Sequence, residues 1–372
     1  MKKILITGGP VHAHLDAVKI ITNKFKGGLM ADLAAYFSMS DNADVHYLAA
    51  PKQGAVLPST ARPNIHIYQH EGFHDYENAV LKFAPDMDAV ILGAAVANLI
   101  PAKPFEGKFP SHNYKEGDII PIDFTIAPRV INKVKKVAPK THLFGFKLLS
   151  GVPYEELIRA AYEIVLDSGA TAVFANDEKD LMQVYAVTKE RGVHPLRRNE
   201  LAGWIWKMIN DGYYKTVFIE NKELLSTSED IENKAKTLID KYRDKFVQVE
   251  NGMIFGTVAV RFGLGFLTTG RGKKELDNLV YVDSVDHAKK EVRIVGFSPK
   301  ASLNAPLLAR LFEHPAVDHI VHYHEQEPLL PVTPYAPPGT TRDSNRQIWR
   351  SRSFNIQGHG CMLLFDKEGK QL

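Results

Sequence analysis

The chain has 372 residues, of which 45% are hydrophobic and 24% are charged, and its formal net charge is +3. This composition is ordinary for a globular protein, and the length is sufficient for two domains with separate cores. The small net charge, without a basic stripe interleaved with aromatic residues, argues against nucleic-acid binding.

The sequence gives few indications of the cellular compartment in which the protein works. Cys361 is the only cysteine, so no internal disulfide can form and a reducing environment is favoured. The apolar run at residues 4–6 is too short for the core of a signal peptide, and no stretch is long enough to cross a bilayer. We therefore expect a cytoplasmic protein without a membrane partner.

The first half alternates apolar, strand-like runs with helical patterns. We expect strands at residues 3–7, 45–49, 89–97, 142–146 and 170–175, and helices from Gly28 onward and at residues 128–137 and 154–168. Such alternation predicts a Rossmann-like parallel sheet with helices on both faces. Ligands of these sheets bind at the carboxyl ends of the strands.

Three strand ends carry residues suited to a ligand. They are Gly8-Gly9-Pro10, residues 94–98 and Asn176-Asp177. The dinucleotide fingerprint G-x-G-x-x-G is absent after the first strand. The loop at residues 22–28, with Lys24 and Lys26, leads into a helix and would suit a phosphate. A plain glycine-rich connection with solvated lysines explains this loop equally well.

The order of these motifs resembles the phosphopantothenoylcysteine synthetase family. The resemblance is carried by residues 6–10, 15–18, 21–23, 27, 94–98, 117–118, 144–146 and 175–177, and it spans about residues 1–215. Members of that family activate a carboxylate with a nucleoside triphosphate and couple the acyl-nucleotide to an amine. The resemblance therefore implies a nucleotide, CTP or ATP, with Mg²⁺.

The resemblance also assigns residues. Asn23 would hold the acyl intermediate, and Lys108 would be the catalytic lysine. The nucleotide would bind at Gly8, Gly9, Gly27, Ala95, Asn98, Phe146, Asn176 and Asp177. The chain departs from the family where Phe25 and Lys26 replace two serines and Asn98 replaces an aspartate that helps to read the base. The replacements remove hydroxyls and carboxylates that the resemblance links to ligation of the family's own substrates.

A polar segment separates the two halves. A helical pattern at residues 201–210 could close the first domain, and Ser228 is a plausible cap for a helix at residues 231–246. We therefore expect domains at residues 1–222 and 228–372.

The second half is rich in strands, expected at residues 255–262, 265–269, 279–282 and 320–325, with a helix at residues 306–312. In the last strand, His322 and His324 would share one face because side chains alternate with a period of two. His359 lies between two glycines, which allow a bend that aims a side chain. Three histidines and an open position suit Zn²⁺. A bare pair of histidines on an exposed strand is the alternative.

This half resembles the class II aldolase/adducin family. The matching segments are residues 256–261, 266–270, 302–304, 315–324 and 358–360, within about residues 230–372. The resemblance implies a class II aldolase-like α/β domain that binds zinc through His322, His324 and His359 and stabilises an enediolate. It places the substrate or its phosphate at Thr268, Thr269, Gly270, Ser302 and Asn304.

Acidic residues are the main departure in this half. Asn304 stands where the family has a carboxylate, and an amide cannot accept a proton at neutral pH. Glu325 and Glu327 are candidate catalytic replacements, with solvated surface carboxylates as the alternative. Arg342, Arg346, Arg350 and Arg352 would suit an anion or a subunit contact.

These features predict a fused enzyme. A zinc lyase of aldolase or dehydratase type would act on a phosphorylated or carboxylated carbonyl compound, beside a nucleotide-dependent, ligase-like domain. The alternatives are a zinc lyase with a nucleotide-sensing first domain, or a degenerate assembly module without catalysis. Because members of both families form oligomers, we expect a homo-oligomer.

Overall fold

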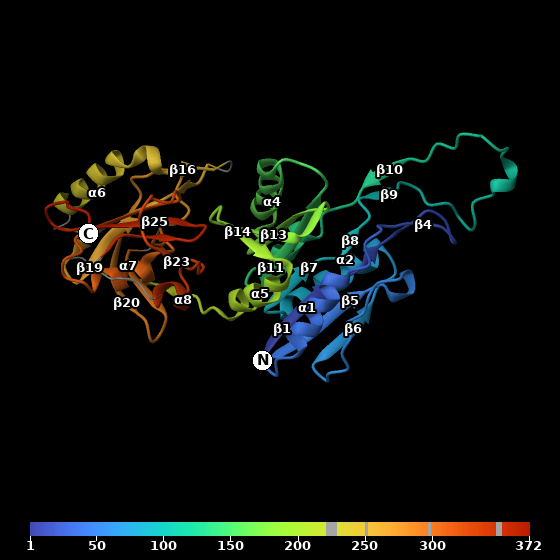
Figure 1. The fold of residues 1–372 in the computed structure, drawn as a ribbon, viewed down its shortest axis with the longest axis horizontal. Helices are drawn as coiled ribbons and strands as arrows, with labels where there is room; N and C mark the ends of the chain where they lie inside the picture. Colours follow the sequence, from blue (N-terminus) through green and yellow to red (C-terminus); the bar gives the residue numbers. More distant parts are fainter. Residues whose placement is uncertain (221–228, 250–251, 297–298, 347–351) are drawn as a thin grey trace. The chain divides into compact units, whose positions relative to one another are not determined.

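A computed structural model describes residues 1–220, 229–249, 252–296, 299–346 and 352–372. The chain forms two compact units, coloured by sequence in Figure 1. The first contains residues 1–189 and 195–209, and the second contains residues 190–194 and 210–372. No helix in these ranges is both long and apolar enough to span a membrane.

The first unit is built on an eight-stranded sheet with the order β14-β13-β12-β11-β7-β1-β5-β6. Its strands are β1 (Lys2–Thr7), β5 (Ala43–Ala49), β6 (Ile65–Gln69), β7 (Ala89–Leu92), β11 (His142–Leu149), β12 (Ala172–Asp177), β13 (Asp180–Thr188) and β14 (Val193–Arg197). The six strands from β12 to β6 are parallel, and β13 is antiparallel to β12. This confirms the expected parallel sheet.

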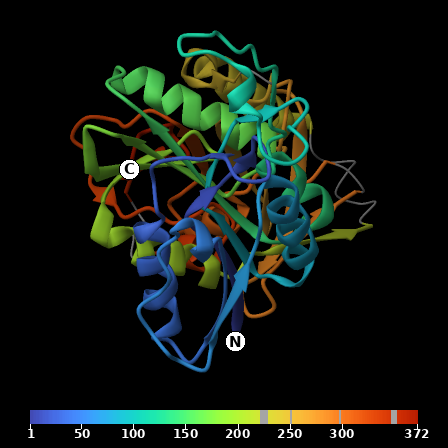
Figure 2. The same ribbon diagram turned by 90° about the vertical axis from the view of Figure 1, so that its right-hand side faces the viewer.

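Helices cover both faces of this sheet, as expected for strands buried on both sides. They are α1 (Gly28–Ser38), α2 (Phe73–Phe83), α3 (Ile131–Val137), α4 (Tyr154–Ser168) and α5 (Leu201–Asn210). The rings of Phe37 on α1 and Trp206 on α5 are 5.8 Å apart, so these two helices share a face. Figure 2 shows α1 (blue) and α2 (teal) on opposite sides of the strands.

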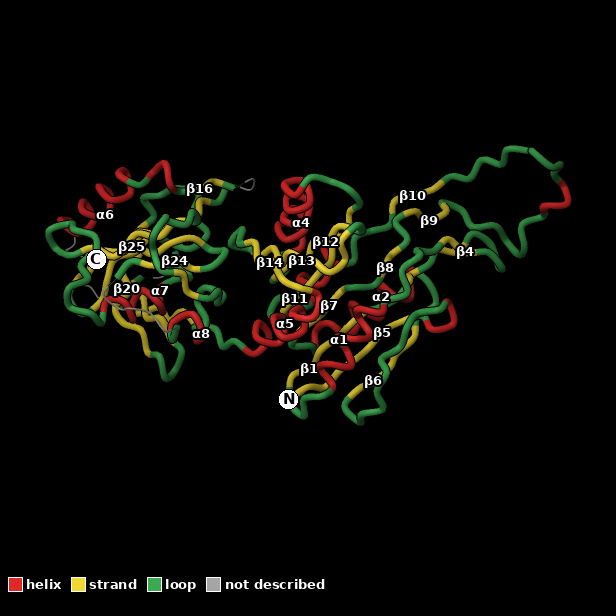
Figure 3. The backbone as a smooth tube through the Cα atoms, in the orientation of Figure 1, coloured by secondary structure: helices red, strands yellow, loops and turns green. Residues whose placement is uncertain are grey.

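Short strands organise the carboxyl edge of this sheet. They are β2 (Pro10–Val11), β3 (Ala13–His14), β4 (Ile20–Ile21), β8 (Ala95–Val96), β9 (Leu99–Pro101) and β10 (Phe124–Ile126). The long connection between β9 and β10 is almost entirely loop (Figure 3). The strand expected at residues 89–97 ends at Leu92, because Gly93 lies against Met30 and the chain turns there into β8.

The second unit is built on a nine-stranded sheet with the order β15-β21-β20-β19-β18-β22-β25-β24-β23. Its strands are β15 (Lys215–Ile219), β18 (Thr257–Phe262), β19 (Gly265–Thr269), β20 (Leu279–Asp286), β21 (Glu291–Val295), β22 (His319–Tyr323), β23 (Val332–Thr333), β24 (Phe354–Ile356) and β25 (Gly360–Phe365). Six of the eight pairings, from β21 to β24, are antiparallel. A small ribbon of β16 (Val247–Gln248) and β17 (Ile254–Phe255) lies outside this sheet.

Three helices accompany the second sheet: α6 (Glu229–Lys241), α7 (Ala305–Phe312) and α8 (Thr341–Ser344). Apolar residues of α6 pack on Val258, Val321 and Tyr323 in one buried cluster. Since side chains alternate along β22, His322 points to the opposite face of the sheet. The architecture is mixed α/β, in agreement with the sequence.

The division between the units differs from the sequence interpretation. Residues 215–219, which the expected first domain included, form β15, and this strand pairs with β21 in the second sheet. A short edge strand whose partner lies far along the chain leaves no local signal of the sheet that it joins. The expected boundary after residue 222 and the expected cap at Ser228 lie outside the described residues.

Candidate functional site

His322 is held in the centre of the second sheet by β18 and β25. Its side chain is buried, and Nδ1 donates a hydrogen bond to the backbone carbonyl of Cys361 at 2.7 Å. Burial lowers the pKa of His322 to about 4, so the ring is neutral at pH 7. A neutral ring that donates from Nδ1 carries its lone pair on Nε2.

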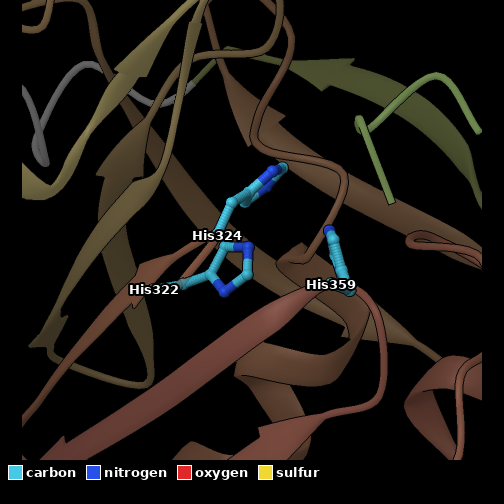
Figure 4. Close-up of side chains that lie close together, drawn as sticks. All are labelled: His322, His324 and His359. Atoms are coloured by element: carbon cyan, nitrogen blue, oxygen red, sulfur yellow. The ribbon is translucent and has the colours of Figure 1, made fainter. Parts of the chain in front are cut away.

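His324 and His359 approach His322 from two loops (Figure 4). His324 follows the end of β22, and its ring stacks on Phe255 at 5.0 Å. His359 precedes β25 in the expected bend, where Gly358 and Gly360 both have positive φ. The three ring centroids lie 4.8–5.1 Å apart, and one nitrogen of each ring lies within 4.8 Å of the others.

The donor set fits a divalent metal. Nε2 of His322 and Nδ1 of His359 are buried, and neither has a hydrogen-bond partner among the described residues. Burial also holds the pKa values of His324 and His359 well below the ordinary value, so all three rings offer neutral lone pairs. Neutral imidazoles that converge in this way are typical ligands of Zn²⁺.

The three histidines line one pocket. Of the expected substrate residues, Gly270, Ser302 and Asn304 line it. The hydroxyls of Ser302 and Thr257 are 2.9 Å apart, and Oδ1 of Asn304 is buried without a partner in the described part of the chain.

Thr268 and Thr269, expected in a phosphate loop, are buried and do not line this pocket. The Thr268 hydroxyl donates to the Val258 carbonyl at 3.0 Å. Both threonines belong to β19, where the antiparallel ladder fixes their direction, so the loop geometry inferred from the motif begins only at Gly270.

Glu325 and Glu327, the candidate catalytic carboxylates, lie elsewhere. Glu325 pairs with Lys245 at 2.8 Å, and Glu327 accepts a hydrogen bond from the Tyr323 hydroxyl. Neither lines the pocket. The strand expected at residues 320–325 ends at Tyr323. Side chains alternate between the two faces of the sheet only within the strand, so this rule does not determine where the side chains after Tyr323 point.

Lys273 and Glu190 are pocket residues that the sequence interpretation did not single out. Lys273 is only 6% exposed, and its ammonium donates to the backbone carbonyl of Gly256. Burial lowers its pKa to about 8. Glu190 also lines the pocket, and its carboxylate accepts a hydrogen bond from the Tyr335 hydroxyl at 3.4 Å. Lys273 sits in a charged run that looks like solvated surface, and Glu190 is distant in sequence, so neither gave a signal.

The arginine cluster is held mainly by internal contacts. Arg342 forms a two-pronged pair with Asp211, with distances of 2.7–3.1 Å. Arg346 pairs with the buried Asp343 and donates to Thr333 at 2.8 Å. Arg352 is exposed, and Arg350 lies outside the described residues. These contacts support a structural role for Arg342 and Arg346 over anion binding.

In the first unit, the glycine loops meet at the carboxyl edge of the sheet. A Cβ on Gly27 would lie 2.1 Å from the amide nitrogen of Gly9, so only glycine allows this approach. The Ala95 amide donates to the Gly9 carbonyl at 2.9 Å, and the Asn23 side chain donates to the Ala95 carbonyl at 3.1 Å. Gly8 directly follows β1 and joins the same group.

The other expected nucleotide residues are more dispersed. Phe146 lies on β11, and Asn176 and Asp177 end β12, whose next residue, Glu178, forms an ion pair with Lys24. Backbone amides of Lys179 and Gly151 lower the pKa of Asp177, which marks it as a turn-holding carboxylate.

Asn98 and Lys108 belong to the segments on either side of β9. The Asn98 carbonyl accepts a hydrogen bond from Ala127 at 2.8 Å. Lys108 is exposed, and the residues before and after it hydrogen-bond to Ala17 and Asp16. The structure therefore places Lys108 beside the Asp16 loop.

Comparisons with known proteins found similarities to parts of the chain. The coenzyme A biosynthesis bifunctional protein CoaBC of Thermococcus kodakarensis is 26% identical over 214 residues, which are 56% of this chain and 51% of that protein. The chain thus spans about half the length of this curated relative. The solved DNA/pantothenate metabolism flavoprotein of Streptococcus pneumoniae is 22% identical and aligns over 56% of this chain and 98% of its own, with a TM-score of 0.49.

Over the C-terminal part, the similar structures include YgbL, a putative aldolase/epimerase/decarboxylase from Klebsiella pneumoniae. It is 16% identical and covers 37% of this chain and 79% of its own, with a TM-score of 0.27. The family model described as the DNA/pantothenate metabolism flavoprotein C-terminal domain matches residues 1–204. Since that match covers more than half of the sequence, the chain belongs to the DNA/pantothenate metabolism flavoprotein C-terminal domain family.

Proposed function

We propose that the protein is a two-domain enzyme whose second unit is a zinc-dependent lyase for a phosphorylated or carboxylated carbonyl compound. The observation that carries this proposal is the convergence of His322, His324 and His359, with two buried ring nitrogens that lack partners in the described chain. Buried polar atoms without partners are costly, so a ligand for them is expected.

These three histidines would hold the ion, and their neighbours would orient them. The Cys361 carbonyl fixes the tautomer and the ring orientation of His322. Phe255 covers one face of His324 and makes one wall of the pocket apolar. When bound, zinc would supply a Lewis acid that polarises a substrate carbonyl.

Proton transfer needs a titratable group in the same pocket. Asn304 cannot accept a proton, and Glu325 and Glu327 do not line the pocket. Glu190 does line it, and the Tyr335 hydroxyl steadies its carboxylate. We assign to Glu190 the acid–base role that the carboxylate missing at Asn304 would have had.

The first unit is proposed to bind a nucleoside triphosphate, CTP or ATP with Mg²⁺, and to activate a carboxylate. The approach of Gly27 to Gly9 and the Asn23–Ala95 hydrogen bond support a phosphate-sized backbone cradle. The ion pair between Lys24 and Glu178 favours the second candidate, a unit that binds nucleotide without catalysis, because it engages a cation of that loop.

Metal analysis tests the proposal directly. Protein purified without chelators should contain about one zinc per chain, and the double variant His322→Ala, His359→Ala should contain almost none. The matched control is His112→Ala, since His112 is exposed in the first unit. Zinc-loaded protein should then cleave or dehydrate members of a panel of small oxo acids and phosphorylated ketoses. A wild-type chain that binds no zinc would refute the metal assignment.

A further inference from the structure

Lys273 is a buried cation for which the described residues supply no counter-ion. Its side chain is 6% exposed, and it lines the pocket of the three histidines. Among the described residues, its ammonium makes one hydrogen bond, to the Gly256 carbonyl, and forms no ion pair. Its neighbour Lys274 is exposed and points to solvent, so the burial is specific to Lys273.

Such a charge needs a partner. Lysine is almost never fully buried unless it is paired, because removal of an ammonium from water is costly. The rings of the neighbouring histidines supply no negative charge, and the carboxylate of Glu190, which also lines the pocket, accepts a hydrogen bond from the Tyr335 hydroxyl. A divalent ion on these histidines would make the pocket still more positive. The missing negative charge is therefore expected to come with the substrate.

The remaining polar groups indicate which anion fits. Thr268 and Thr269, which the family resemblance assigns to a phosphate, are buried and do not line the pocket. The pocket is also lined by Thr257 and Ser302, whose hydroxyls are 2.9 Å apart, and by the exposed Arg271. One buried ammonium and a hydroxyl pair suit the two oxygens and the single charge of a carboxylate.

We propose that Lys273 binds the carboxylate of a small 2-oxo acid, so that the adjacent carbonyl lies at the three histidines. This inference rests on the proposed lyase function and narrows its substrate class. Lys273 and all three histidines line the same pocket, which supports this adjacency. Lys273 is therefore the residue that selects for a carboxylate beside the carbonyl.

Two variants test this role. Lys273→Gln keeps a donor for the Gly256 carbonyl and removes the charge, and Lys273→Met removes both. Lys274→Gln is the matched control next to it. Pyruvate, the smallest 2-oxo acid, is titrated calorimetrically into the full chain with and without zinc, and inorganic phosphate is titrated in parallel. Zinc content is measured for every sample.

We expect Lys273→Gln and Lys273→Met to weaken pyruvate binding by about 10- to 100-fold, the usual effect of losing a charged hydrogen bond. Zinc content should not change, and Lys274→Gln should bind as the wild type does. Equal pyruvate affinity in wild type and Lys273→Gln would overturn the inference. So would a wild type that does not bind pyruvate, or one that binds phosphate more tightly than pyruvate through Lys273.

The two proposals fail separately. If the chain binds no zinc but still binds pyruvate through Lys273, the metal function fails and the carboxylate site stands. If zinc is stoichiometric but pyruvate affinity does not depend on Lys273, the carboxylate site fails and the metal centre stands.

Discussion

Nδ1 of His322 donates its proton to the carbonyl of Cys361 on the adjacent strand, at 2.7 Å. This bond leaves Nε2 as the nitrogen with a free lone pair, and that atom is buried without a partner in the described chain. Pairing of β22 with β25 places the Cys361 carbonyl beside the His322 ring. This backbone contact therefore determines which nitrogen of His322 carries the proton.

The bend that carries His359 should be intolerant of any side chain. A Cβ on Gly360 would lie 2.0 Å from the Tyr323 carbonyl oxygen, and φ is +117°. Gly360→Ala should therefore lose more than about 2 kcal/mol of stability and most zinc affinity. Gly369→Ala is the control, because its φ is +78° but no atom lies within 4 Å. Thermal unfolding and metal titration measure both effects, and similar losses in the two variants would contradict the steric argument.

Substitution of Glu190 and substitution of Glu325 should have different effects on lyase activity. If Glu190 transfers the proton, Glu190→Gln should lower lyase turnover by about 100-fold or more, within the usual range for general acid–base catalysis. Glu325→Gln removes an exposed partner of Lys245 and should leave turnover nearly unchanged. Steady-state kinetics with equal zinc loading decide between them. Loss of turnover in Glu325→Gln alone would restore the interpretation made from the sequence.

Nucleotide binding should depend on the glycine contact in the first unit. Gly27→Ala would place a Cβ 2.1 Å from the Gly9 nitrogen, so the two loops must separate. Calorimetric affinity for CTP or ATP with Mg²⁺ should fall at least about tenfold. Gly107→Ala is the matched control, since Gly107 also has positive φ but open surroundings. Wild-type nucleotide affinity in folded Gly27→Ala would show that the nucleotide binds elsewhere.

Stability of the first unit should fall in mild acid. Burial lowers the pKa of His70 to about 4, whereas an unfolded histidine titrates near its ordinary value of 6.5. Between these values His70 binds a proton in the unfolded chain but not in the folded chain. The free energy of unfolding therefore decreases as pH falls from about 6.5 to 4. The contribution of His70 is at most about 3 kcal/mol.

Denaturant unfolding at several pH values measures this slope. Fluorescence of Trp204 and Trp206 on α5 reports on the first unit. His70→Gln should flatten the slope, and His74→Gln, at an exposed position of α2, should leave it unchanged. An identical slope in wild type and His70→Gln would show that burial of His70 does not cause the acid sensitivity.

Local patterns predicted those parts of the site that depend on local rules. The alternation along β22, the glycines around His359 and the glycine loops after β1 all follow from short-range geometry, and the parallel sheet follows from continuous apolar strands. Glu325 and Glu327 do not line the pocket, because the strand ends at Tyr323 and nothing local in the sequence marks that end.

Long-range features gave no signal in the sequence. Lys273 stands in the run Arg271-Gly272-Lys273-Lys274-Glu275, which has the composition of a solvated turn, yet the fold buries only Lys273 among its charged residues. Similarly, no residue of β15 is fully buried, and only its pairing with β21 shows to which sheet it belongs. The burial of Lys273 and the sheet that β15 joins both depend on residues that are distant in the sequence.

The bend at His359 has a further consequence for a chain with a single cysteine. An ion shared by His324 and His359 would close the chain between them into a ring, as a disulfide does in oxidised proteins, and would restrict the unfolded ensemble in the same way. Formation of this cross-link would depend on the concentration of zinc, whereas formation of a disulfide depends on the redox potential of the surroundings. The second unit would then become easier to unfold and to digest wherever zinc is scarce.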